Sequence, residues 1–148
     1  MDCELLVFSK LSQESYSNFI MSIIEMDSTL IANYKSYADY ISINCEYFTM
    51  IFDIDEIIGL DIVEEDFGFV ANISIRIQLL RNTLDQGLNL LFKILNYIIK
   101  YADENLLLLE NGSKVIIEKK NQHIYSNVNE NDETKYPFHL IESEIEIR

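Results

Sequence analysis

Residues 67–79, with the sequence FGFVANISIRIQL, alternate between apolar and mostly small or polar side chains. In an extended chain such alternation places the apolar side chains on one face. The residues on that face are Phe67, Phe69, Ala71, Ile73, Ile75, Ile77 and Leu79, and Val70 is the one large apolar residue on the other. A strand with one apolar and one polar face is typical of an antiparallel sheet that has its core on one side. The segment therefore predicts a long, half-buried strand.

Two segments have apolar residues at helical rather than strand spacing, and each predicts an amphipathic helix. The first covers residues 12–25, with Ser12 as the expected N-cap. Its apolar stripe consists of Tyr16, Phe19, Ile20, Ile23 and Ile24. The second covers residues 83–101, with Asn82 or Thr83 as the expected cap. Its stripe consists of Leu84, Leu88, Leu91, Leu95 and Ile98, widened by Phe92 and Ile99.

Shorter strand patterns occupy much of the remaining chain. They cover residues 4–8, 40–45, 47–54, 106–109 and 115–118, with a further strand beginning at Ile124. Asn111-Gly112 predicts a tight hairpin turn, because both residues accept a positive φ. A second turn is expected at residues 120–122. Residues 26–40 remain ambiguous. In residues 141–147, three Ile and Ser143 alternate with three Glu, so the segment forms either a terminal strand or part of a frayed acidic segment over residues 128–148.

The predicted elements and the length of 148 residues favour one α+β domain spanning residues 1–148. A chain of this length buries roughly 68–70% of its unfolded surface, which is enough for a substantial core. Two helices that each carry a single apolar stripe can both pack on one face of a sheet. We therefore expect two layers: a mainly antiparallel sheet with two amphipathic helices on one face.

The chain is strongly acidic, with 25 Asp and Glu against 11 Lys and Arg and a formal charge of −14. This balance argues against binding to nucleic acid or to an anionic membrane, because both require clustered bases. It permits a basic protein partner, although solubility alone also explains it. The chain has neither a basic leader nor an apolar run of about 20 residues, which predicts a cytoplasmic protein. Cys3 and Cys45 are too few for a disulfide framework and are expected to be reduced.

The acids are densest in residues 53–66, DIDEIIGLDIVEED, and no base occurs between Lys35 and Arg76. The seven acids are Asp53, Asp55, Glu56, Asp61, Glu64, Glu65 and Asp66. The stretch is not a calcium loop of the EF-hand type, because Ile57 and Ile58 occupy positions that need a ligand and a glycine. Two interpretations remain: a solvated acidic connection, or a surface that meets a cationic partner.

Tyr34, Tyr37 and Tyr40 follow one another at intervals of three residues and are expected to present one aromatic edge. Such an edge is explained either by core packing or by protein binding, in which exposed tyrosines contribute strongly to affinity. We therefore include the three tyrosines with the seven acids among the candidate partner-binding residues.

No catalytic signature is found. The sequence has no nucleophile elbow, phosphate-binding loop or dinucleotide-binding motif, and only four glycines. His123 and His139 lack companions at metal-ligand spacing. The sequence therefore predicts a protein that is not an enzyme and that uses no cofactor and no metal. The remaining enzyme hypothesis is a pair of carboxylates, which would need two facing acids in a concave pocket.

Residues 61–127 resemble bacterial immunity proteins of contact-dependent and polymorphic toxin systems. The resemblance rests on DFGFVANISIRIQLL, on the helix that follows, and on ENLLLLENGSKVIIEKKNQHIYSN. It implies a small cytoplasmic protein that binds and neutralises a cognate toxin domain, in many cases a basic nuclease. No catalytic residues are implied. The alternative is an acidic structural or adaptor subunit without a toxin partner.

Overall fold

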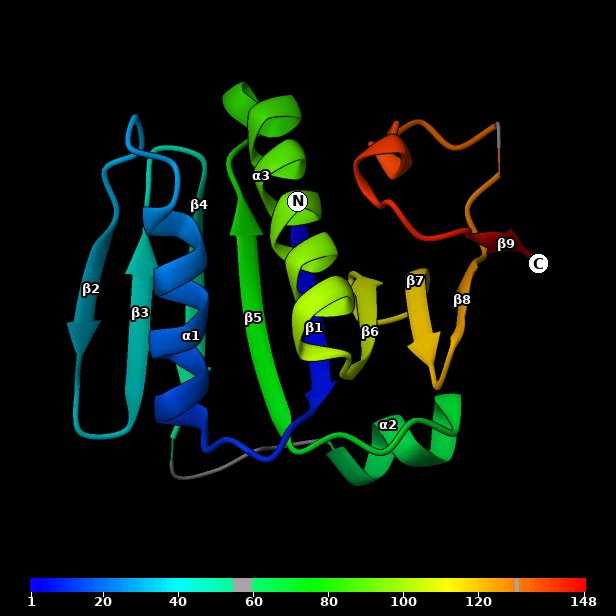
Figure 1. Cartoon of the computed structure of the whole chain (residues 1–148), viewed down its shortest axis with the longest axis horizontal. Helices are drawn as coiled ribbons and strands as arrows, with labels where there is room; N and C mark the ends of the chain where they lie inside the picture. Colours follow the sequence, from blue (N-terminus) through cyan, green and yellow to red (C-terminus); the bar gives the residue numbers. More distant parts are fainter. Residues whose placement is uncertain (55–59, 130) are drawn as a thin grey trace.

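A nine-stranded sheet runs through the part of the chain that the computed structural model describes, residues 1–54, 60–129 and 131–148 (Figure 1). The strand order is β2-β3-β4-β5-β1-β6-β7-β8-β9. All neighbours are antiparallel except β8 and β9. The strands are β1 (Asp2–Phe8), β2 (Asn33–Ser36), β3 (Tyr40–Asn44), β4 (Phe48–Asp53), β5 (Ile73–Leu79), β6 (Asn105–Glu110), β7 (Lys114–Lys120), β8 (His123–Ser126) and β9 (Glu146–Ile147). The predicted α+β fold with a mainly antiparallel sheet is confirmed.

Two long helices, α1 (Gln13–Glu25) and α3 (Leu84–Tyr97), lie side by side on one face of the sheet (Figure 1). The Ser12 side chain caps α1 by accepting a hydrogen bond from the Ser15 N–H at 3.1 Å. Thr83 precedes α3 but its side chain makes no capping bond, and a short 3-10 turn, Arg81–Thr83, leads into the helix. A π-helical turn, Ile98–Ala102, extends α3 to the predicted end.

The main core lies between these helices and the sheet. The predicted helix residues Leu88, Leu91 and Leu95 are all buried there, together with Tyr16 and Ile20 of α1. Burial of two apolar stripes against the apolar face of a sheet supplies the driving force for this arrangement.

A third helix, α2 (Leu60–Phe67), corrects the prediction for this region. The strand expected over residues 67–79 begins only at Ile73, and Phe67 ends α2. Leu60, Val63 and Phe67 form a short helical stripe, which overlaps the alternation that suggested a strand. Gly68 ends the helix with φ +64°, a conformation that suits glycine.

This short helix packs on the face of the sheet opposite α1 and α3. Val63 and Phe69 form a second, smaller core there with Leu6, Leu107 and Leu109. The expectation of helices on one face alone is therefore incomplete. Two helices cover one face, and α2 covers part of the other.

The meander β6-β7-β8 follows the prediction closely. Asn111 and Gly112 have φ values of 52° and 74° in the β6-β7 turn, and Asn121 has φ 59° in the β7-β8 turn. The C-terminal segment returns to the sheet, where Tyr136 and Ile141 are buried. The structure thus has a short terminal strand, β9, beside β8.

Candidate protein-interaction surface

Four of the predicted acids lie together on α2: Asp61, Glu64, Glu65 and Asp66. All four are exposed. The stripe of Leu60, Val63 and Phe67 faces the sheet, so the residues between them in sequence point toward solvent. The sequence suggested that these acids lie on a loop, whereas the structure orders them along eight helical residues. We call these four carboxylates the α2 acidic face.

Contacts with the sheet hold α2 in position. An isolated helix of this length is marginal in water, so its stability depends on tertiary packing. Val63 is 8% exposed and Phe69, just after the helix, is 2% exposed. Both belong to the smaller core formed with strands β1 and β6. The acidic face is therefore carried on an anchored element.

The four carboxylates lack direct partners, although one base lies close to the end of α2: Lys120 Nζ donates to the Gly68 carbonyl at 3.2 Å. None of them forms an ion pair or accepts a side-chain hydrogen bond within the described residues. Glu64, Glu65 and Asp66 also occupy the last turn of α2, which contains no base. The C-terminal end of a helix carries the negative end of its dipole, so acids there destabilise it. These three acids therefore cost α2 some stability, which the Lys120 ammonium at the Gly68 carbonyl offsets in part.

Ile62 is a residue of this surface that the sequence analysis did not single out. It is 56% exposed on α2, where it lies off the apolar stripe. An exposed isoleucine beside these acids adds an apolar side chain to the surface. Its position one residue before Val63 is the sequence signal that would have identified it, once α2 is known to be a helix.

The other three acids of residues 53–66 do not belong to the α2 acidic face. Asp53 ends β4 and pairs with Arg76 of β5, whose Nε and Nη2 donate to its two carboxylate oxygens at 3.2 Å. Its charge is therefore partly compensated. Asp55 and Glu56 lie outside the described residues.

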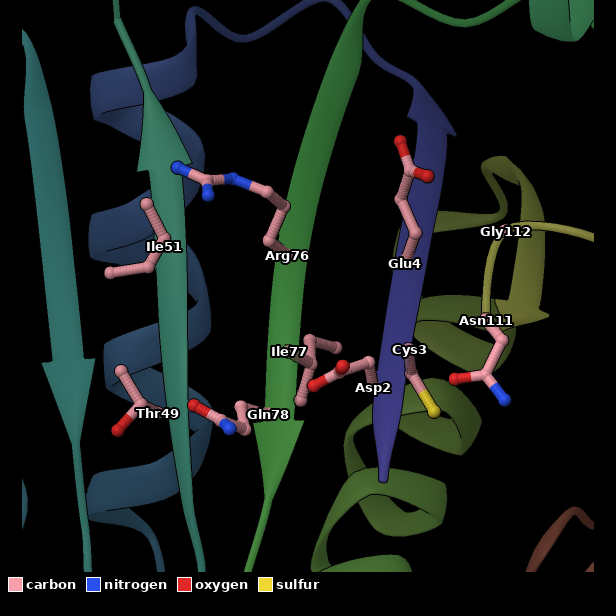
Figure 2. A pocket seen from close by; sticks show the side chains of 10 residues that line it. All are labelled: Asp2, Cys3, Glu4, Thr49, Ile51, Arg76, Ile77, Gln78, Asn111 and Gly112. Carbon is pink, nitrogen blue, oxygen red and sulfur yellow. The ribbon is translucent and has the colours of Figure 1, made fainter.

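Beside α2, the same face of the sheet forms an open hollow of about 650 Å³ over β4, β5 and β1. Figure 2 shows Glu4 and Arg76 among its lining side chains, with α1 on the far side of the strands. Asp2 and Glu4 stand two residues apart on β1 and both line the hollow. Asp2 is exposed, and the Glu4 carboxylate accepts a hydrogen bond from Ser74 Oγ at 3.1 Å. Two carboxyl groups act as acid and base when burial raises the pKa of one above that of the other. Neither Asp2 nor Glu4 is buried.

The three tyrosines do not form one aromatic edge. Tyr34 packs toward the main core, with its hydroxyl 2.8 Å from Ser17 Oγ. Tyr37 and Tyr40 stack across the β2-β3 turn, with ring centroids 4.5 Å apart. The spacing of three residues predicted one aromatic edge, but the segment is a hairpin. Residues three apart on a strand point to opposite faces, so Tyr34 and Tyr37 are separated.

The remaining candidate groups fit structural roles. Burial, followed by the nearby Glu110 carboxylate, raises the pKa of Cys3 to about 12, so its thiol is unreactive at neutral pH. Cys45 is half-buried, and neither cysteine forms a disulfide. His123 and His139 are both exposed. Within the described ranges, no group of three or more potential ligands is placed to hold a metal ion.

Comparisons of the chain with protein-family models, with curated proteins and with solved structures found no match. No helix in the described parts of the chain is both long and apolar enough to cross a membrane. The function must therefore be argued from the surfaces themselves.

Proposed function

We propose that this chain is a cytoplasmic immunity protein that binds a cognate toxin domain and neutralises it stoichiometrically. The observation that carries the proposal is the α2 acidic face: four exposed, unpaired carboxylates on an anchored helix. This geometry favours a basic protein surface as partner, such as the cleft of a nuclease-like toxin. The resemblance of residues 61–127 to immunity proteins, a range that includes α2, supplies the biological class.

Complementary charge accounts for how such a pair would associate. Opposite potentials steer two proteins together and raise the association rate, while contributing less to final affinity. Groups already held in place lose little conformational entropy on binding. The packing of Val63 and Phe69 provides this preorganisation for α2. Exposed Ile62, on the same helix, offers an apolar contact beside the acids.

An acidic structural or adaptor subunit is the second candidate, in which the charge serves solubility alone. Solubility depends on net charge and hardly on where each acid is placed. Acids needed only for solubility can lie anywhere on the surface, so they need not gather on one anchored helix. The two functions therefore differ in what happens when acids are removed from α2 rather than from elsewhere.

The test needs a candidate toxin, which we expect to be the C-terminal domain of a large secreted protein encoded by a neighbouring gene. In the variant, Asp61→Asn, Glu64→Gln and Glu65→Gln are combined. The matched control combines Glu25→Gln, Glu133→Gln and Glu144→Gln, three exposed acids away from α2. Stopped-flow association is measured at low salt and again at high salt. We expect the α2 variant to associate about tenfold more slowly at low salt, with the control close to wild type.

Salt supplies a second readout. Wild-type association should slow as salt rises, because charges further apart than a Debye length of about 8 Å at physiological ionic strength are screened. The α2 variant should lose most of this salt dependence. If it instead binds at the wild-type rate at low salt and still protects toxin-expressing cells, the α2 acids serve solubility and the contact lies elsewhere.

A further inference from the structure

The two edges of the sheet differ in how they are protected. At one end β9 has only two residues, Glu146 and Ile147. At the other end lies β2, with four residues and no strand beyond it in the described chain (Figure 1). β2 is also short and carries Lys35, which both limit pairing, but its outer backbone groups have no strand beside them in the described chain, and such an open edge is a template for pairing with another strand.

The hydrogen-bond pattern shows which groups of β2 point outward. The Tyr37 N–H donates to the Tyr40 carbonyl at 2.8 Å, which makes these two residues a hydrogen-bonded pair. Hydrogen-bonded pairs alternate along an antiparallel ladder, so Lys35 and Asn33 also bond inward to β3. The N–H and C=O groups of Ala32, Tyr34 and Ser36 therefore point to the open edge.

The residues around β2 continue the alternation and expose an apolar pair. Leu30, Ala32 and Tyr34 pack toward the main core. The residues between them, together with Tyr37, point to the opposite face. Ile31 on that face is 82% exposed, and Tyr37 is 45% exposed. Ile31 and Tyr37 are therefore large, exposed side chains beside the open edge, one before and one after Tyr34 in the chain.

We propose that β2 pairs antiparallel with β2 of a second copy of this chain, with the two-fold axis at Tyr34. Tyr34 then lies opposite Tyr34 of the second copy, and Ala32 lies opposite Ser36. All the outward backbone groups are satisfied in this register. Ile31 meets Tyr37 of the second copy, once on each side of the axis, and Lys35 meets Asn33. The proposal does not depend on the toxin-binding function.

Both neighbouring registers are worse. Sliding the second strand by two residues in one direction moves the two-fold axis from Tyr34 to Lys35. Lys35 then lies opposite Lys35 of the second copy, and like charges directly opposite each other are destabilising. A shift in the other direction places Ile31 opposite Lys35 and separates it from Tyr37. Intermediate shifts would pair outward groups with inward ones and turn the apolar residues to different faces.

The self-complementary pairing, which satisfies the same outward groups and repeats the Ile31–Tyr37 contact on both strands, points to a second copy as the occupant, and the charge of this edge permits one. Two chains of charge −14 repel each other over most of their surfaces. Residues 28–40 carry only Lys35 and Asp39, so their net charge is zero. This edge is therefore a place where two copies can approach closely. A strongly basic partner would gain nothing from charge here and is better suited to the α2 acidic face.

Sedimentation equilibrium tests the assembly. A dimer has twice the chain mass of 17.3 kDa. We expect the dimer fraction to increase as salt rises from about 0.1 M to about 1 M, because the Debye length falls from about 10 Å to about 3 Å and the repulsion is screened. A monomeric mass at every salt and protein concentration overturns the proposal.

Two variants and a matched control locate the contact. Ile31→Ser removes both Ile31–Tyr37 contacts and should weaken the dimer about tenfold, given the usual strength of cross-strand pairs. Ser36→Pro removes an outward N–H, which an edge strand tolerates, and should also weaken it. Ile62→Ser makes the same side-chain change at another exposed isoleucine and should leave the dimer intact. A dimer that withstands both β2 variants contradicts the proposed edge.

Disulfide trapping tests the register. In a Cys45→Ser background, the double variant Ala32→Cys, Ser36→Cys keeps Lys35 and should form an intermolecular disulfide, because these residues lie opposite each other with Cα atoms about 5.5 Å apart. Neither single variant should crosslink efficiently. A dimer that persists while the double variant fails to crosslink would overturn the proposed axis at Tyr34.

Discussion

Leu91 lies within α3 with its side chain fully buried in the main core. Replacing it with alanine removes buried methyl groups and leaves a cavity, so we expect Leu91→Ala to lower the free energy of unfolding by about 2–5 kcal/mol. Urea denaturation measures this change. Asn89→Ala, at an exposed position of the same helix, should stay within about 0.5 kcal/mol of wild type. An unchanged midpoint for Leu91→Ala would mean that α3 presents a different face to the sheet.

Residue burial was predictable where a periodic pattern extends over several turns, as it does for Leu88, Leu91 and Leu95. The burial of Lys119 could not be predicted from periodicity. Its side chain is 4% exposed, although lysine is rarely buried. Its Nζ donates to the Asp103 carboxylate at 3.0 Å and to the Glu104 carbonyl at 3.3 Å. These partners follow the π-helical turn after α3, and only the tertiary fold brings them to β7.

Among the elements, the C-terminal segment, residues 131–148, is held by buried Tyr136 and Ile141 and also by two carboxylates whose charge depends on pH. A hydrogen bond from Lys114 is the main cause that lowers the pKa of Asp132, and one from Lys100 does the same for Glu142. A lowered pKa contributes stability that is fully present above the unfolded value, here 3.8 or 4.5, and is lost as pH falls through the folded value. We therefore expect acid to release this segment before the sheet unfolds.

Hydrogen exchange measures this release. The amides of Leu140 and Ile141 donate to the Pro137 and Phe138 carbonyls, so they report on the segment. Their protection should fall at a higher pH than that of β1 and β5. The double variant Lys100→Met, Lys114→Met should show weakened protection already at neutral pH. Simultaneous loss of protection in the segment and in the sheet would contradict the expected order.

Elements were predictable from sequence in proportion to their length. Helices α1 and α3 were recognised because their stripes run over several turns, whereas α2 has eight residues and a stripe of three. Its last residue, Phe67, also begins an apparent strand alternation. Contacts with Leu6 and Leu107 decide in favour of a helix, and those contacts join segments far apart in sequence. β2 was missed because NYKS has no strand pattern of its own.

For the whole molecule, the local pairings were easier to predict than the order of the strands. Hairpins such as β3-β4 and β6-β7 follow from turns between adjacent strands. The position of β1 between β5 and β6 does not. Its apolar run Leu5-Leu6-Val7, buried on both faces, is the one sequence signal for a central strand. Burial of Leu6 depends on α2, so this signal could be interpreted only together with that helix.

The net charge of −14 gives a prediction for the entire fold. Self-repulsion among unpaired acids destabilises the compact state and is screened by salt. Two of the ion pairs found in the described residues, Arg76–Asp53 and Lys100–Glu142, are open to solvent, and such pairs contribute about 0–1 kcal/mol each. Repulsion should therefore outweigh attraction, so the urea midpoint should rise between about 0.1 M and about 1 M sodium chloride. The dimer-deficient Ile31→Ser variant should show the same rise, which separates charge screening from self-association. A midpoint that falls with salt would show that the ion pairs, including the one between buried Lys119 and Asp103, dominate the electrostatic balance.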